Sequence, residues 1–88
     1  SRARAAAAPI PDHDSDLFDR LRAVRRELAD ARQVPAYVIF SDATLRQMAA
    51  DRPRTQDEFR HISGVGEKKL AEFAETFLAA IATYLRHE

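Results

Sequence analysis

Apolar residues recur every three or four positions in two long segments of the chain, which is the spacing of one face of an α-helix. The first segment runs from about residue 16 to residue 32, and the second from about residue 67 to the end. Their apolar stripes are Leu17, Leu21, Val24, Leu28 and Ala31, widened by Phe18, and then Leu70, Phe73, Phe77, Leu78, Ile81 and Leu85. Two amphipathic helices that bury these stripes against each other are therefore predicted.

The run VPAYVIF, residues 34–40, has the composition of a β-strand. The chain offers no second strand-like run to pair with it, and an isolated strand is not stable. We therefore interpret the run as an apolar connector that begins where Pro35 ends the preceding helix. Val38, Ile39 and Phe40 are expected to fill the core.

Two shorter helices are predicted between the long ones. Ser41 is a good N-cap for a helix over residues 42–51, which carries apolar residues on one side. Thr55 opens the sequence TQDE, which has the capping-box pattern, so a short helix carrying Phe59 and Ile62 should follow. The chain is therefore predicted to be all-α, a compact bundle of four to five helices.

Residues 1–15 lack a periodic apolar face. They include two prolines, which stop helix propagation, an alanine run and one large aliphatic side chain. Such a segment is typical of a linker or disordered arm. We expect a linker at residues 1–15 and a single folded domain at residues 16–88.

Composition excludes several classes of protein. The 88 residues carry 14 basic and 14 acidic side chains and no cysteine. A net charge of zero argues against a uniform positive coat for nucleic acid, although a local basic patch remains open. His13, His61 and His87 have no metal-ligand spacing, and no catalytic constellation can be argued. We expect a soluble, cytoplasmic, monomeric domain that is not an enzyme, spans no membrane and holds no metal or cofactor.

The segment ISGVGEKKL holds both glycines and both lysines of the chain. Gly64 can take a positive φ in a turn, and Gly66 leaves the first N–H groups of the last helix open to an anion. Lys68 and Lys69 add positive charge beside them, whereas Glu67 opposes it. This is the helix-hairpin-helix pattern that grips a nucleic-acid backbone without reading sequence. The alternative is a plain turn between two helices.

Two further groups of side chains are candidates for nucleic-acid contact. Tyr37 lies beside a proline, and an exposed ring there would be a stacking platform for an unpaired base; a buried ring is the alternative. Arg22, Arg25 and Arg26 are expected to share a face of the first helix opposite the leucine stripe. That face is either a second phosphate contact or simply solvated.

Two stretches together, VPAYVIFSDATLRQMA and ISGVGEKKLAEFAETFLAAI, resemble the HRDC domain, named for helicase and RNase D C-terminal. The resemblance covers about residues 17–85, and the wording VIFSDATL is most similar to the version in bacterial RecQ helicases. It implies a bundle of about five helices with a helix-hairpin-helix-like GVG turn.

The resemblance also implies a function. It suggests an accessory domain that binds single-stranded or partial-duplex DNA weakly for an ATP-dependent 3'–5' DNA helicase of repair and recombination, near the bacterial nucleoid. The residues that fall on DNA-contacting positions are Tyr37, Lys68, Lys69, Arg22 and Arg25, with Gly64 and Gly66 shaping the turn.

Two alternatives remain open from the sequence. Some HRDC domains contact their own helicase core or a protein partner in place of DNA, and the neutral charge of this chain suits that role. The second alternative is a ribonuclease D, in which the domain would help to position structured RNA. Salt separates the first alternative from DNA binding, because DNA binding weakens steeply with salt.

Overall fold

The protein is built from five α-helices. A computed structural model describes the backbone of residues 12–87 and the side chains of residues 15–87. The helices are α1 (Asp12–Arg32), α2 (Ala36–Ile39), α3 (Asp42–Asp51), α4 (Gln56–Arg60) and α5 (Glu67–Arg86). No strand occurs within the described range, so the all-α prediction is confirmed. Helix α1 begins before position 16, so the end of the expected linker is helical; residues 1–11 lie outside the described residues.

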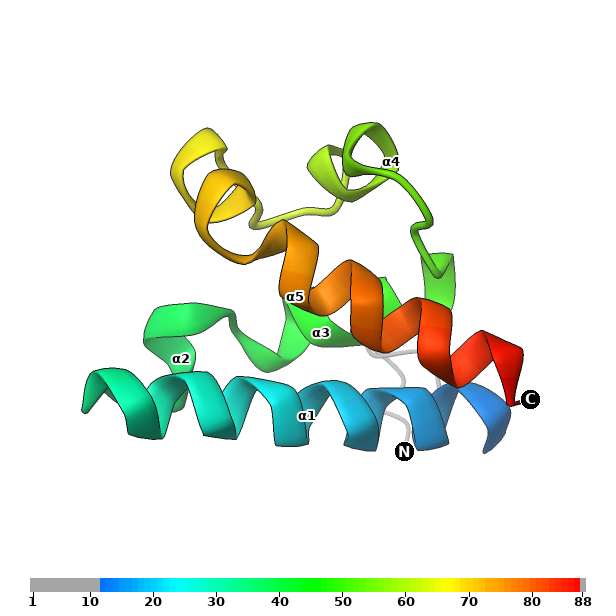
Figure 1. Ribbon diagram of the computed structural model, residues 1–88, viewed down its shortest axis with the longest axis horizontal. Coiled ribbons are helices and arrows are strands. Elements are labelled where there is room, and N and C mark those ends of the chain that lie inside the picture. The colour runs from blue at the N-terminus through cyan, green and yellow to red at the C-terminus, as the bar shows by residue number, and fades with distance from the viewer. Residues whose placement is uncertain (1–11, 88) are drawn as a thin grey trace, which may run out of the picture.

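The two long helices form the frame of the domain. Helices α1 and α5 pack against each other and run in opposite directions (Figure 1). Helix α3 packs on α1, and α2 sits over the C-terminal end of α1. Helix α4 packs on α5, on the side away from α1 (Figure 1). The start of α5 is thereby brought to the same end of the molecule as α2.

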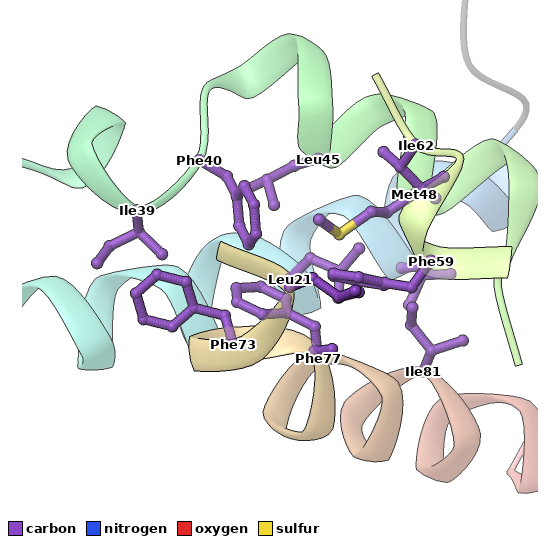
Figure 2. Packing of buried hydrophobic residues seen from close by; sticks show 14 of the residues in the cluster. Leu21, Ile39, Phe40, Leu45, Met48, Phe59, Ile62, Phe73, Phe77 and Ile81 are labelled. Carbon is purple, nitrogen blue, oxygen red and sulfur yellow. The ribbon is translucent and has the colours of Figure 1, made fainter. Parts of the chain in front are cut away.

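A single aromatic cluster forms the centre of the core (Figure 2). The ring of Phe40 meets three others edge to face, with centroid distances of 6.1 Å to Phe59, 5.7 Å to Phe73 and 5.2 Å to Phe77. Leu21 and Phe77, from the two long helices, are fully buried there, as the two stripes predicted. Each such burial contributes about 1.5–3 kcal/mol.

The buried face of α1 differs from the predicted stripe at three positions. Arg25 is buried with 8% exposure and Ala29 with 3%, whereas Ala31 is exposed. The guanidinium of Arg25 donates a hydrogen bond of 2.9 Å to the carbonyl oxygen of Phe40, and it lies 2.8 Å from the carboxylate of Asp42. The expectation that Arg25 lies on a solvent face opposite the leucines was therefore wrong. Its guanidinium is buried, and a buried cation needs polar or charged partners, which Phe40 and Asp42 provide.

The contact with Arg25 changes the pKa of Asp42. The hydrogen bond from Arg25 lowers the pKa of the Asp42 carboxyl below its ordinary value of 3.8. The positive charges of Arg25, Arg22 and Arg46 act in the same direction, while partial burial opposes them. The ionised carboxylate is therefore favoured in the folded protein.

The connector between α1 and α3 is partly helical. Gln33 takes a left-handed conformation with a φ of 57°, and the N–H of Val34 donates to the carbonyl oxygen of Ala29 at 3.0 Å. These are the features of a Schellman ending. Pro35 is then the N-cap of α2, a helix that the sequence did not predict. Of the expected core residues, Ile39 and Phe40 are buried, but Val38 is 42% exposed because α2 turns it outward.

The predicted caps of the two middle helices are confirmed. The side chain of Ser41 accepts a hydrogen bond from the backbone N–H of Thr44, and that of Thr55 accepts from the N–H of Glu58. The carboxylate of Glu58 reaches one residue further back than a capping box requires and accepts from the N–H of Arg54 at 2.7 Å. Side chains thus satisfy N–H groups that have no partner within these helices.

The glycine turn is fixed to the start of α3. Gly64 has a φ of +94°, as the sequence predicted, although it lies beyond His61, the C-cap of α4. The hydroxyl of Thr44 donates a hydrogen bond of 3.0 Å to the carbonyl oxygen of Ser63. A Cβ atom at Gly64 would overlap this same hydroxyl, whereas the space beside Gly66 is open. The turn is therefore held by both its own conformation and the side chain beneath it.

We expect the contribution of Asp42 to stability to depend on pH. Because its pKa is lower in the folded protein, the contribution is present above the unfolded pKa and is lost as the pH falls through the folded pKa. The difference in unfolding free energy between wild type and Asp42→Asn, measured by urea denaturation, should be constant above about pH 5 and shrink below about pH 4. With Arg25→Met in both proteins, this shrinkage should largely disappear. A difference that stays constant down to pH 2.5 would contradict the assignment.

The two glycines should respond differently to alanine. Gly64→Ala adds a Cβ atom at a positive φ and against Thr44, so it should cost about 2 kcal/mol or more. Gly66→Ala enters open space at a φ of −92° and should cost less than about 1 kcal/mol. Thermal or urea unfolding of the matched pair measures the difference. Equal stability of the two variants would show that the turn relaxes around Gly64.

Candidate nucleic-acid interface

An open groove lies where the end of α1, helix α2 and the start of α5 meet. Its volume is about 240 Å³. The lining residues are Arg32, Val34, Val38, Ile39, Lys68, Lys69, Glu72 and Phe73. Both lysines of the glycine-turn motif thus lie beside the connector that carries Tyr37. The groove combines an apolar floor with cations, which suits the bases and the phosphates of a flexible strand.

Tyr37 and Val38 give α2 an exposed apolar surface. Tyr37 is 72% exposed and Val38 is 42% exposed, and they are the two large hydrophobic side chains that are exposed among residues 15–87. The structure thus decides between the two readings of Tyr37 and favours the exposed ring. A ring in this position is free to stack on a base.

The two lysines differ in their surroundings. Lys68 is exposed, whereas Lys69 is half-buried and its ammonium nitrogen lies 5.6 Å from the centroid of the Phe40 ring. A cation over an aromatic face is attracted by the ring quadrupole. Lys69 therefore offers a charge that is held against a core ring, and Lys68 offers an exposed one.

The start of α5 adds partial positive charge to this region. Gly66 is the N-cap and makes no side-chain capping hydrogen bond, so the first N–H groups of α5 gain no partner from it. Glu67, which opposes anion binding by its charge, lies 3.3 Å from the guanidinium of Arg60, which also approaches Asp57 at 3.5 Å. The carboxylate of Glu67 is thus turned toward a cation on α4 and partly neutralised.

A second pocket flanks α2 along α1. It has a volume of about 320 Å³ and is lined by Asp19, Arg22, Ala23, Arg25, Arg26 and Ala36. Arg22 is exposed, with its guanidinium carbon 5.5 Å from the ring centroid of Phe18 and its nitrogen 3.8 Å from the carboxylate of Asp19. The guanidinium of Arg25 already makes a hydrogen bond to the carbonyl oxygen of Phe40 and an ion pair with Asp42. Of the three arginines singled out from the sequence, Arg22 and Arg26 are therefore exposed at the surface, whereas Arg25 is buried.

Sequence reasoning missed Arg32. Its guanidinium carbon lies 4.9 Å from the centroid of the Phe73 ring, and its nitrogen lies 3.7 Å from the carboxylate of Glu72. Arg32 is the last residue of α1, and its sequence neighbours give no sign that α5 will lie beside it. Only the packing of α1 on α5 places this third cation in the groove.

Within residues 15–87, no cluster of three histidine or acidic side chains is placed to hold a metal ion. Over the same range, no helix combines the length and the hydrophobicity that a membrane crossing requires.

The chain is similar in sequence to known proteins. The sequence model of the HRDC domain matches residues 14–81. The chain is 46% identical over 80 residues to the ATP-dependent DNA helicase RecQ of Bacillus subtilis (strain 168), covering 91% of this chain and 13% of that protein. It is 33% identical over 70 residues to the ATP-dependent DNA helicase UvrD2 of Mycobacterium tuberculosis (strain CDC 1551 / Oshkosh), covering 80% of this chain and 10% of that protein.

A solved structure shares the fold. The HRDC domain 3 of D. radiodurans RecQ superimposes with a TM-score of 0.80 at 42% sequence identity, covering 83% of this chain and 96% of that one. The match of the sequence model, the identity to RecQ proteins and the shared fold point to the same conclusion. The chain belongs to the HRDC domain family and is similar to the HRDC domains of bacterial RecQ helicases.

Proposed function

We propose that this domain is a non-catalytic accessory module that binds single-stranded or partial-duplex DNA weakly for a RecQ-type helicase. One observation carries the proposal. The exposed ring of Tyr37 stands on a short helix beside a groove that holds Lys68 and Lys69. Stacking on an aromatic ring beside cations that track the backbone is how proteins hold single strands without reading their sequence.

The small number of available cations sets the strength of binding. Arg25 is buried and hydrogen-bonded to Phe40, and the formal net charge of the chain is zero. About three phosphate contacts are therefore expected, which on single strands gives a slope of log K against log salt near −2. Binding of this kind is too weak to hold a helicase on DNA alone and would instead adjust which DNA structures the enzyme acts on.

The helicase context also rests on the relatives. The chain spans 13% of the length of the Bacillus subtilis RecQ protein that it matches. In this proposal the ATPase motor and 3'–5' unwinding reside elsewhere in a longer chain that acts in DNA repair and recombination in the bacterial cytoplasm, at the nucleoid. The helicases among the relatives favour this setting over ribonuclease D.

A protein-docking role is the second candidate, and the apolar floor of the groove favours it. Val34, Val38, Ile39 and Phe73 would also accept apolar side chains from the helicase core or from another protein. Such a contact would depend little on salt, whereas phosphate contacts weaken steeply as salt rises.

A nuclear magnetic resonance titration with a single-stranded oligothymidine tests the proposal. Amide shifts should concentrate in α2 and in residues 64–69 and should diminish as salt is raised. Shifts confined to other surfaces, or none at millimolar DNA in low salt, would leave protein docking as the better account.

Substitutions in the site should separate stacking from charge. Tyr37→Ala should weaken DNA binding by roughly 1–3 kcal/mol and leave the salt slope unchanged, because it removes a stacking surface and no charge. Lys68→Ala should make the slope shallower by about 0.7, the value for one phosphate on a single strand. Lys68 suits this test because Lys69 also contacts the core ring of Phe40. Binding is measured by fluorescence anisotropy at several salt concentrations.

Conservative variants are the controls. Tyr37→Phe should keep most of the affinity, and Lys68→Arg should keep the slope. An unchanged affinity in Tyr37→Ala would remove the ring from the interface.

A further inference from the structure

The side chains that line the groove carry more positive than negative charge. Three of its side chains are cationic, namely Arg32, Lys68 and Lys69, and one, Glu72, is anionic. Glu72 lies three and four positions after the two lysines on α5, so it occupies the same helix face one turn further on. A carboxylate in this position repels any phosphate that the lysines attract.

Glu72 also engages the third cation. One carboxylate oxygen of Glu72 lies 3.7 Å from a guanidinium nitrogen of Arg32. The two side chains are 40% and 45% exposed, so the pair is open to water and to competing ions. An exposed ion pair of this length is weak and readily exchanges one anion for another.

Arg32 makes a second contact at the groove, a cation–π contact with a core ring that leaves its charge unneutralised. Its guanidinium lies over the ring of Phe73, at 4.9 Å from the centroid, and Phe73 belongs to the core. Arg32 is therefore already placed at the groove when no DNA is present. Its planar group can take a phosphate in place of the carboxylate without leaving the ring.

We propose that Glu72 limits the affinity of the groove for DNA by acting as an internal competitor for Arg32, so that Arg32 is a phosphate contact held in reserve. The inference rests on the proposed function, since it assumes that a DNA strand enters this groove. The carboxylate offsets one of three positive charges there and occupies the cation that the core holds in position. Loss of its charge should convert a weak DNA-binding domain into a stronger one.

The test compares two variants of equal charge. Glu72→Gln should bind a single-stranded oligothymidine about fivefold more tightly than wild type at low salt, with a salt slope steeper by about 0.7. Glu75→Gln removes the same charge from the same helix, but Glu75 is exposed and does not line the groove. It should change the affinity by less than about twofold, because it leaves Arg32 paired. Melting temperatures report whether each variant is folded.

A double variant asks whether the gain passes through Arg32. Arg32→Gln combined with Glu72→Gln should return both affinity and slope to within about twofold of wild type. A gain that persists in the double variant would overturn the inference. If wild type binds and Glu72→Gln binds no better than Glu75→Gln, the inference fails and the proposed function stands. If none of these folded proteins binds at low salt, both fail together.

Discussion

Phe40 makes the contacts on which the rest of the domain depends. Its ring meets Phe59 of α4 and Phe73 and Phe77 of α5 edge to face, each contact being worth about 0.5–1.5 kcal/mol beyond the burial of area. Its carbonyl oxygen accepts a hydrogen bond from the buried Arg25 of α1. One residue between two helices therefore joins three others. The carbonyl of a non-helical residue needs a donor when it is buried, and Arg25 supplies it.

The candidate site is built around the same residue. Lys69 lies over the ring of Phe40, and Arg32 lies over the ring of Phe73, which packs against Phe40. The cations of the groove are thus positioned by aromatic faces of the core. A cationic side chain that already contacts a ring loses less conformational entropy when an anion binds, because the contact already restricts its rotamers.

Periodicity and capping chemistry were enough to predict most of the helices, because long stripes and the side chains of Ser41 and Thr55 leave local signals. Helix α2 escaped prediction because four residues are too few to show a period. Arg25 was assigned to solvent since charged residues are rarely buried unless paired, and its partners are 15 and 17 positions away. The motif lysines and Tyr37 were singled out from the glycine turn and the proline nearby, and the family resemblance added to that reading, whereas Arg32 and Glu72 depend on how α1 packs on α5 and leave no local signal.

Helix α2 divides four consecutive side chains among four environments. Ala36 lines the second pocket, along α1, Tyr37 faces water, Val38 borders the groove and Ile39 enters the core. Each step along a helix rotates the next side chain by about 100°. Insertion or deletion of one residue between Pro35 and Phe40 would therefore reassign every environment at once and draw the ring of Phe40 out of register. Exchange of one side chain in this segment changes one environment, whereas a change in its length changes all four.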